Sequence, residues 1–448
     1  MKKIPVIPAK HWFFRNSLEV LKDPLKFFIE TFEQYGDIYD VNANFIKIYV
    51  LANPDYIQEV MVTNKTDYAK SDDYKVLKHS LGNGLLTSEG EFWKKQRRIA
   101  QPAFHRKSMK KLLDTMITST QAMVDKWSSR NELQITDEMQ FITLDIVTKC
   151  LFGSALKPNL YEKIHEAVTV GNEFLSSKIM NPFTLPVWFP TAASRHYKKT
   201  RDFNNKVILD IINTRANDPT EYHDLLSMLM NAEDEETGEK MSPKQLLDEA
   251  MTIFVAGHET TANALSWTFY LLSQHPDKLQ KLQQELQEVL QGEAPSFETL
   301  RGLEYTQMVL EESMRLYPPA WSIGRKVVQD TELCGHALPK GAGLILDVYT
   351  MHRHPNFWDN PHTFEPERFH PSQKKGRHKY AFIPFGAGQR MCIGNNFAMM
   401  EMKIILAMVF QKFSLTLSPN APIVEPEPLV TLRPKNGILM DINALVEA

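Results

Sequence analysis

The feature that most constrains this fold is the long apolar stretch at residues 251–272, which reads MTIFVAGHETTANALSWTFYLL. The dipeptides Ser-Pro at 242–243 and His-Pro at 275–276 are typical of the start and the end of a helix around it. A helix of this length could cross a bilayer, which requires about 20 apolar residues. His258 and Glu259 interrupt the stretch, however, and ionisable side chains are costly in the hydrocarbon region. We therefore expect a helix that is buried in the core of a large soluble protein.

The rest of the chain predicts a mainly α protein with a small β portion. Helical periodicity dominates from about residue 90 to residue 291. Before it, GDIYDV (36–41) and FIKIYVLA (45–52) are rich in β-branched and aromatic residues and are joined by NAN, as in a hairpin. A strand-like tail, LVTLRPKNGILMDI (429–442), follows near the end. Because both ends contribute to the β portion, we expect a single domain over residues 1–448.

Charge balance and cysteine usage exclude several protein classes. The chain has 51 Lys and Arg residues against 54 Asp and Glu, a formal charge of −3, so no nucleic-acid partner is expected. The three cysteines, Cys150, Cys334 and Cys392, are odd in number and far apart, which disfavours a disulfide framework and favours a reducing compartment. The N-terminal MKKIPVIPAK lacks the apolar region of a signal peptide. We expect a soluble, cytoplasmic protein.

A glycine-rich turn, FGAGQRMCIG (385–394), places Cys392 directly before an apolar helix. A lone cysteine is more often a small buried residue, and a phosphate loop is a second alternative, but the glycine spacing does not match the phosphate-binding patterns. A thiolate is a strong metal ligand, and a helix N-terminus with backbone N–H groups stabilises it. Glycines let the backbone approach a flat partner closely, and Arg390 is placed to meet an anionic group on that partner. Thiolate, close backbone and arginine together indicate haem.

This turn resembles the haem-binding signature F-x-x-G-x-R-x-C-x-G of the cytochrome P450 family, and every fixed position is filled, including the last, Gly394. The resemblance implies haem b (iron protoporphyrin IX) as the cofactor and Cys392 as the axial ligand of its iron. It also implies that Arg390 contacts a haem propionate. Phe385 would pack beside the sulfur, where it tunes solvent exposure and redox potential.

The segment AGHETT (256–261) resembles the oxygen-activation segment of the same family. Dioxygen bound to the iron on the face opposite the thiolate needs room and a supply of protons. Ala256 and Gly257 would border the haem, with Gly257 removing a side chain where the helix crosses it. Thr260 can divert a backbone carbonyl from the helical ladder and Glu259 supplies an acid, so these two are expected to be catalytic. The alternative is a polar patch buried by packing; a zinc helix is excluded because H-E-x-x-H would need a histidine where the chain has an alanine.

Two further motifs resemble conserved helices of the family. Glu312 and Arg315 of EESMR are spaced i, i+3 and, with Arg368 of FEPERF, resemble its buried E-x-x-R structural triad. Alone, such a pair would be solvated on a helix surface in most proteins. Trp93 and Arg97 of WKKQR match the W-x-x-x-R helix, whose side chains reach a haem propionate.

The four motifs occur in the family's order, so the resemblance covers nearly the whole chain. It implies the cytochrome P450 fold, with haem buried between the long helix that carries Thr260 and the helix after Cys392. Arg325, in PPAWSIGR, occupies the position of another propionate-binding arginine. The family positions of the substrate pocket are filled by uncharged residues, namely Leu86, Phe254, Ala256, Ala320, Trp321, Ile323 and Leu432. We therefore expect an apolar small-molecule substrate such as a fatty acid, terpenoid, sterol or carotenoid.

Two segments without acidic residues indicate a docking surface for a redox partner. Eight Lys or Arg residues lie between Lys94 and Lys111, and five lie between Lys374 and Arg390. In the family both segments lie on the cysteine side of the haem, so an acidic ferredoxin- or flavodoxin-type electron donor is expected. The alternative is a set of solvated helix faces. No fused reductase is expected.

The apolar, proline-punctuated segment NPFTLPVWFPT (181–191) would join two helices over the substrate entrance. A hydrophobic lip that makes a peripheral membrane contact, or admits lipid-like molecules, would consist of Phe183, Leu185, Val187, Trp188 and Phe189. Ordinary packing of a lid is an equal alternative.

Together these features describe a bacterial-type haem-thiolate monooxygenase that inserts one oxygen atom of dioxygen into a C–H bond. A peroxide-dependent peroxygenase or an isomerase on the same fold is one alternative, but such variants characteristically lack an acid–alcohol pair like Glu259 and Thr260. A non-catalytic haem sensor is another alternative, and it would need neither this pair nor a docking surface.

Overall fold

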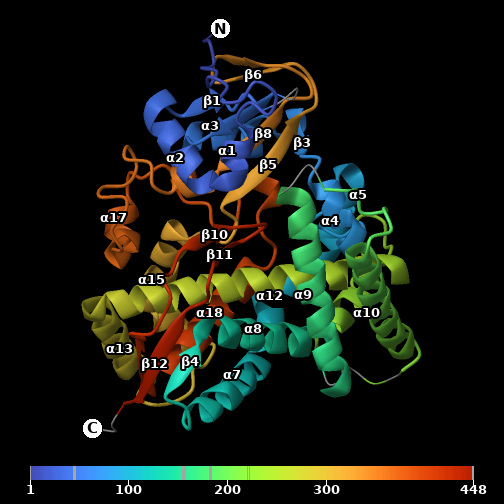
Figure 1. Cartoon of the computed structure of the whole chain (residues 1–448). Helices are drawn as coiled ribbons and strands as arrows, with labels where there is room; N and C mark the ends of the chain where they lie inside the picture. Colours follow the sequence, from blue (N-terminus) through green and yellow to red (C-terminus); the bar gives the residue numbers. More distant parts are fainter. Residues whose placement is uncertain are drawn as a thin grey trace. The chain divides into compact units, whose positions relative to one another are not determined.

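Figure 1 shows the computed structural model of the chain, which describes residues 2–43, 47–153, 158–180, 184–218, 220 and 222–445. The backbone groups into two units. Unit 1 comprises Met1–Tyr74, Met308–Cys392 and Pro426–Arg433, and unit 2 comprises Lys75–Gln307, Ile393–Glu425 and Pro434–Ala448. Each unit is assembled from segments that are far apart in the sequence. The prediction of one domain concerns both units together and stays a prediction.

Unit 1 is built around a five-stranded sheet with the strand order β1-β2-β8-β5-β3. Its strands are β1 (Ile38–Asp40), β2 (Ile48–Leu51), β3 (Tyr68–Lys70), β5 (Ser322–Val327) and β8 (Gly343–Asp347). β2 and β8 run parallel, and the other neighbouring strands run antiparallel. The hairpin predicted from GDIYDV and FIKIYVLA is confirmed, because Tyr39 of β1 pairs with Val50 of β2 in an antiparallel register. A separate hairpin pairs β6 (Thr331–Leu333) with β7 (His336–Leu338).

The helices of unit 1 are short apart from α2 and α15. They are α1 (Ser17–Lys22), α2 (Pro24–Tyr35), α3 (Pro54–Gln58), the part of α15 (Glu304–Leu316) from Met308 onward, α16 (Val348–Met351) and α17 (Pro371–Lys374). α2 shows how local sequence sets such an element: the Asp23 carboxylate accepts the N–H of Lys26 at 3.0 Å, Pro24 begins the helix, and Gly36 ends it at a φ of 84°. Its Phe28 packs into an apolar cluster with sheet residues.

Unit 2 contains most of the helical structure. Its helices are α4 (Tyr74–Leu81), α5 (Gly90–Ala100), α6 (Arg106–Lys110), α7 (Leu113–Trp127), α8 (Ile135–Phe152), α9 (Pro158–Met180), α10 (Ala192–Ala216), α11 (Leu225–Asn231), α12 (Pro243–Gln274), α13 (Pro276–Leu290), α14 (Thr299–Gly302) and α18 (Asn395–Phe410). α12 is 32 residues long, and α8 packs along it. The Ser242 hydroxyl accepts the N–H of Gln245 at 3.2 Å and the helix ends at its C-cap, His275, which confirms both predicted ends.

The β portion of unit 2 comes mostly from the end of the chain. β12 (Leu439–Ala444) pairs antiparallel with both β4 (Glu132–Gln134) and β9 (Phe413–Leu417). β10 (Pro426–Pro428) pairs with β11 (Leu432–Pro434), and this pair of strands belongs to unit 1 except for Pro434. The predicted strand-like tail therefore forms β11 and β12. The mainly α class with a small β portion is therefore confirmed. Among the helices in the described residues, none combines the length and the apolar character needed to cross a membrane.

Candidate active site

The turn that carries Cys392 lies at the end of the middle segment of unit 1. Gly386 and Gly388 adopt φ values of 74° and 64°, which favour glycine. A Cβ at Gly388 would lie 2.2 Å from the carbonyl oxygen of Met61, so a side chain has no room there. The Cys392 N–H donates to the carbonyl oxygen of Phe385 at 2.9 Å. The glycines thus let the chain fold back in a tight turn that ends at the cysteine.

The three cysteines differ in how accessible their thiols are. Cys150 on α8 is buried, and burial raises the pKa of its thiol. The Cys334 thiol donates to Glu59 Oε2 at 2.9 Å, and burial together with this carboxylate raises its pKa to about 12. Cys392 alone is exposed. Because the thiolate is the metal-binding form of cysteine, Cys392 is the best candidate ligand of the three.

Arg325 on β5 is a buried cation of unit 1, with 6% of its surface exposed. Its guanidinium donates to the carbonyl oxygen of Gly324 at 2.8 Å and to the sulfur of Met61 at 3.2 Å. Neither partner is an anion, and within the described residues no carboxylate pairs with this guanidinium. A buried charge without a counter-charge is costly, so Arg325 is suited to bind an anionic group. Arg390 and Phe385 are half-buried in the turn.

The middle of α12, in unit 2, has a window of partial exposure. Residues 245–252 and 261–269 are all buried, whereas in 253–260 only Phe254 and His258 are buried. Ala256 is the exposed residue of this window, and it is flanked by half-buried side chains. A long helix whose buried surface is interrupted at one alanine can present a flat face there to a ligand.

Thr260 makes the hydrogen bond that its sequence position predicts. Its hydroxyl donates to the carbonyl oxygen of Ala256 at 2.7 Å, while α12 continues as an α-helix across this bond. Packing against α8 also favours glycine at position 257, which the sequence did not reveal. A Cβ there would lie 3.2 Å from a methyl group of Val147 on α8. Glu259 is half-buried beside Thr260.

Unit 2 also carries the predicted W-x-x-x-R pair. Trp93 on α5 is buried, and Arg97, one turn later, is half-buried. The Arg97 Nε donates to Gln101 Oε1 at 3.0 Å. Gly394, the last fixed glycine of the turn, is the N-cap residue of α18.

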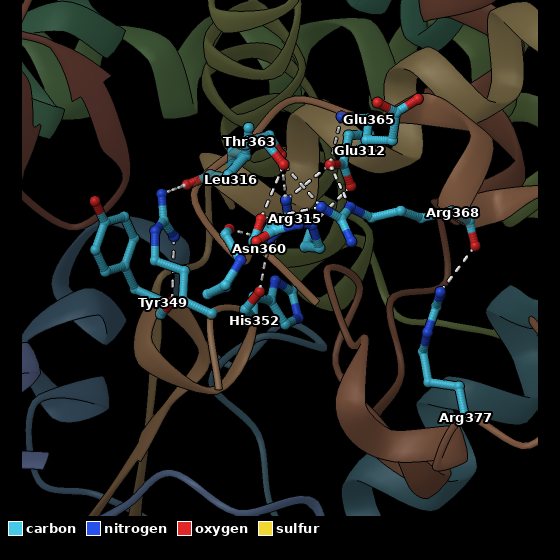
Figure 2. Close-up of polar contacts among 12 residues, drawn as sticks. Glu312, Arg315, Leu316, Tyr349, His352, Asn360, Thr363, Glu365, Arg368 and Arg377 are labelled. Carbon is cyan, nitrogen blue, oxygen red and sulfur yellow. Dashed lines mark hydrogen bonds and ion pairs between the residues drawn. The ribbon is translucent and has the colours of Figure 1, made fainter. Parts of the chain in front are cut away.

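Glu312, Arg315 and Arg368 form a buried ionic network in unit 1, which confirms the predicted triad (Figure 2). Arg315 donates from Nε to Glu312 Oε2 at 2.6 Å and from Nη2 to Oε1 at 2.7 Å. Arg368 Nε lies 3.3 Å from Glu312 Oε1. Arg315 also donates to the carbonyl oxygens of His352, Pro361 and Thr363. The triad therefore ties α15 to the segment that leads to the cysteine turn.

The cytochrome P450 family model matches residues 5–440 of the chain. The chain belongs to the cytochrome P450 family. This P450 is 32% identical to cyclooctatin synthase of Streptomyces melanosporofaciens, over 93% of this chain and 91% of that protein. It is 30% identical to cyclooctat-9-en-7-ol 5-monooxygenase of the same organism, over 91% and 88% of the two chains. The solved structure of the cytochrome P450DA heme domain matches with a TM-score of 0.90 at 26% identity, covering 99% of this chain and 98% of that chain.

These comparisons confirm the predicted family and fold, and they show that the protein is a P450 monooxygenase. Membership of the family implies a haem-thiolate cofactor, a redox partner, dioxygen and an organic substrate. Each unit of this P450 has groups that suit a haem. Unit 1 has the exposed cysteine Cys392 and the buried cation Arg325, and unit 2 has the partly exposed residues around Ala256 on α12. The residues present therefore fit the cofactor.

The predicted pocket residues of the P450 fall into two groups. Those with exposed or half-buried side chains are Leu86, Ala256, Ala320 and Ile323. Those covered by other protein side chains are Phe254, Trp321 and Leu432. Phe254 packs against Phe152 of α8, and the Trp321 indole N–H donates to the carbonyl oxygen of Leu429 at 2.8 Å. A side chain without free surface cannot contact a ligand unless its neighbours move, so the first group is the better placed to line a pocket.

The first basic segment is less cationic in the fold than in the sequence. Arg98 pairs with Asp234 at 2.9 Å and with Glu236 at 2.8 Å. Lys95 pairs with Glu239, which follows these two acids closely in the sequence. Two more cations of the segment are paired, with Lys94 contacting Glu91 and Lys110 contacting Glu298. Acidic residues outside the segment therefore neutralise part of its charge, and the predicted docking surface over 94–111 stays a prediction.

The second basic segment is also partly engaged. Lys374 pairs with Glu311 at 2.7 Å. Arg377 lies over the ring of Trp358, 4.2 Å from its centroid, and donates to the carbonyl oxygen of Arg368 at 2.8 Å. The ion pair neutralises the charge of Lys374, and the contacts of Arg377 hold its guanidinium against the protein.

Much of the predicted apolar lip is exposed. Trp188 has 78% of its surface exposed, and Leu185 and Phe189 are exposed as well. Val187 is half-buried and packs on an apolar cluster formed by α9 and α10. Phe183 lies outside the described residues.

Proposed function

We propose that this P450 uses haem b to hydroxylate a C–H bond of an apolar, terpenoid-like substrate, with electrons from a separate protein. The observation that carries the proposal is the exposed cysteine Cys392 at the end of the glycine turn. The substrate class is supported by a relative whose name gives cyclooctat-9-en-7-ol as the compound it oxidises. Both units carry residues of the haem motifs, which supports one domain over residues 1–448.

In this proposal Cys392 binds the iron as a thiolate, and Phe385 shields the sulfur. Four residues bind or approach the propionates, namely Arg325, Arg390, Trp93 and Arg97. Arg325 has the clearest physical reason, since a propionate would supply the counter-charge that its described surroundings lack. Bound haem would supply the chemistry that lets dioxygen and two electrons oxidise a C–H bond.

Thr260 and Glu259 would move protons beside Ala256. As folded, the Thr260 hydroxyl gives its own hydrogen to the carbonyl oxygen of Ala256, so its oxygen is free to accept a hydrogen bond. To pass a proton on, the hydroxyl must rotate away from that carbonyl. Glu259 is one residue away and half-buried, and it would replenish the proton.

The substrate would meet the accessible apolar residues Leu86, Ala320 and Ile323. None carries a charge, which supports a substrate that is recognised by shape and apolar contact.

The electron donor would be an acidic ferredoxin- or flavodoxin-type protein. Its docking surface would use the basic residues with no acidic partner in the described residues, of which Lys107 and Lys111 belong to the first segment. The exposed Trp188 and Phe189 would make a peripheral membrane contact or admit apolar substrates. Three cysteines without a disulfide among the described residues fit a reducing, cytoplasmic location.

The proposal is tested with purified holoprotein, a ferredoxin, its reductase, NADPH and a panel of terpene alkenes and alcohols. We expect a hydroxylated product whose added oxygen comes from labelled dioxygen. Thr260→Ala should consume NADPH with little product, whereas Thr268→Ala should behave as the parent. Thr268 is the matched control because its hydroxyl also donates to the carbonyl four residues earlier on α12, at 2.7 Å. Product formed with hydrogen peroxide but never with the electron donor would contradict the proposal.

A further inference from the structure

The loop of residues 82–88, between α4 and α5, lies unusually close to α12 within unit 2. A Cβ at Gly82 would lie 2.0 Å from Asp248 Oδ1, and a Cβ at Gly84 would lie 2.1 Å from Thr252 Oγ1. Gly82 also has a φ of 59°. The two glycines therefore allow a contact between loop and helix that no other residues would permit.

Two carboxylates of α12 accept hydrogen bonds from the backbone of this loop. The Asn83 N–H donates to Asp248 Oδ2 at 3.0 Å, and the Leu85 N–H donates to Glu249 Oε2 at 3.0 Å. Glu249 is fully buried and Asp248 nearly so. Leaving a buried side-chain acceptor without a donor is costly, so these two bonds hold the loop on the helix.

The carboxylates are themselves held by their own helix. Gln245 Nε2 donates to Glu249 Oε1 at 2.7 Å and to the carbonyl oxygen of Asn83 at 3.3 Å. Lys244 forms an ion pair with Asp248. One face of the first turns of α12 thus contacts both donors and acceptors of the loop backbone.

The held loop carries Leu86, which is exposed although it follows the anchored Leu85 directly. Thr252, which contacts Gly84, lies one turn before Ala256 in the exposed window of α12, a rise of about 6 Å. Gly84 of the loop therefore contacts α12 directly before this window.

We propose that Asp248 and Glu249 are positioning residues for substrate selection: their carboxylates hold loop 82–88 on α12 and so fix Leu86 as a wall of the pocket. The inference rests on the proposed function for the pocket, but the anchoring of the loop is independent of it. Neither residue touches substrate. Each acts through the backbone of the loop.

The first test measures amide hydrogen exchange of peptides covering residues 82–88 in the holoprotein. Glu249→Leu removes the acceptor of the Leu85 N–H, and we expect exchange in this loop to become about tenfold faster or more. Glu249→Gln keeps an amide oxygen that can accept the same bond, so its exchange should stay close to the parent. Glu288→Gln, an exposed acid-to-amide change on α13, is the control and should have no effect. Unchanged exchange in Glu249→Leu would overturn the anchoring.

The second test titrates ferric holoprotein with imidazole and with 4-phenylimidazole and follows the optical spectrum. Imidazole can bind iron without a pocket wall, whereas the phenyl ring needs one. We expect Glu249→Leu to weaken the binding of 4-phenylimidazole about fivefold to tenfold more than the binding of imidazole. This size corresponds to losing part of the apolar contact between the phenyl ring and one leucine side chain. Leu86→Ala should change the ratio of the two azole affinities in the same direction, while the amide hydrogen exchange of residues 82–88 stays unchanged.

The outcomes separate the two proposals. An equal loss of affinity for both azoles in Glu249→Leu, or an unchanged ratio in Leu86→Ala, would overturn the positioning role. If Glu249→Leu does not fold, Asp248→Ala, which removes the acceptor of the Asn83 N–H, and Leu86→Ala carry the same comparison, and an unchanged ratio of the two azole affinities in either variant would overturn it. A holoprotein without a thiolate spectrum would instead refute the proposed function, while the exchange result would stand.

Discussion

Glu312→Gln is predicted to destabilise the protein far more than the same change at the neighbouring Glu311. Glu312 is fully buried, and its two oxygens accept from Arg315 at 2.6 and 2.7 Å and from the N–H of Glu365 at 2.9 Å. Arg368 lies 3.3 Å away. The substitution keeps the shape of the side chain but removes the only negative charge that these contacts give to the two arginines.

The size of the effect follows from burial. Arg315 has no exposed surface, so losing its counter-charge leaves a buried cation, and breaking a buried pair in this way costs about 3–5 kcal/mol. Glu311 makes an ion pair of similar length, 2.7 Å to Lys374, but the lysine side chain is 45% exposed. A pair that water screens contributes less than about 1 kcal/mol. The two adjacent residues on α15 therefore compare the counter-charge of a fully buried arginine with that of a half-exposed lysine.

The assay is urea unfolding at pH 7 followed by far-ultraviolet circular dichroism, with the midpoint compared among the parent, Glu312→Gln and Glu311→Gln. A shift in midpoint at an unchanged slope reports a change in the free energy of unfolding. We expect a large downward shift for Glu312→Gln and almost none for Glu311→Gln. Equal, small shifts for both variants would refute the reasoning, since burial would then make no difference to the network.

Further predictions concern other buried or unpaired charges. Burial raises the pKa of Asp347 to about 6, so the free energy of unfolding should fall by about 3 kcal/mol as pH rises from about 4 to above 6. Asp347→Asn should remove this pH dependence, which thermal unfolding measured at several pH values would show. Burial also raises the pKa of Glu401, whose two oxygens have no hydrogen-bond partner among the described residues, so Glu401→Gln should increase the unfolding midpoint at pH 7 but not at pH 4. Arg325→Leu should stabilise the haem-free protein yet release haem to apomyoglobin about tenfold faster or more, because the arginine is buried without an anion until a propionate binds. Lys107→Glu should slow reduction by a ferredoxin more than Lys95→Glu does in stopped-flow measurements at low salt, because Lys95 is already paired with Glu239.

Features encoded by local spacing could be predicted from the sequence. The ends of α12 follow from Ser242 and His275, and the Glu312–Arg315 contact follows from an i, i+3 spacing on one helix. The hydrogen bond from Thr260 to Ala256 is of the same kind, since four residues bring the two groups together on any helix.

Contacts between distant segments could not be predicted in this way. Arg98 is 136 residues from Asp234, and Asn83 is 165 residues from Asp248. Sequence spacing does not reveal which acid will fold onto a basic helix, so the segment around Arg98 looked more cationic than it is. The same limit hid the contact of Gly257 with α8 and the burial of Phe254, because both depend on which helix packs against α12.

The most direct test of the central claim is the absorption spectrum of the reduced, carbon-monoxide-bound holoprotein. Thiolate ligation by Cys392 predicts a strongly red-shifted Soret band in the parent protein. Cys392→Ser should lose this band. The control is Cys334→Ser, at a cysteine whose thiol donates a hydrogen bond to Glu59, and it should keep the band. A parent spectrum typical of histidine-ligated iron, or a red-shifted band that persists in Cys392→Ser, would contradict the assignment.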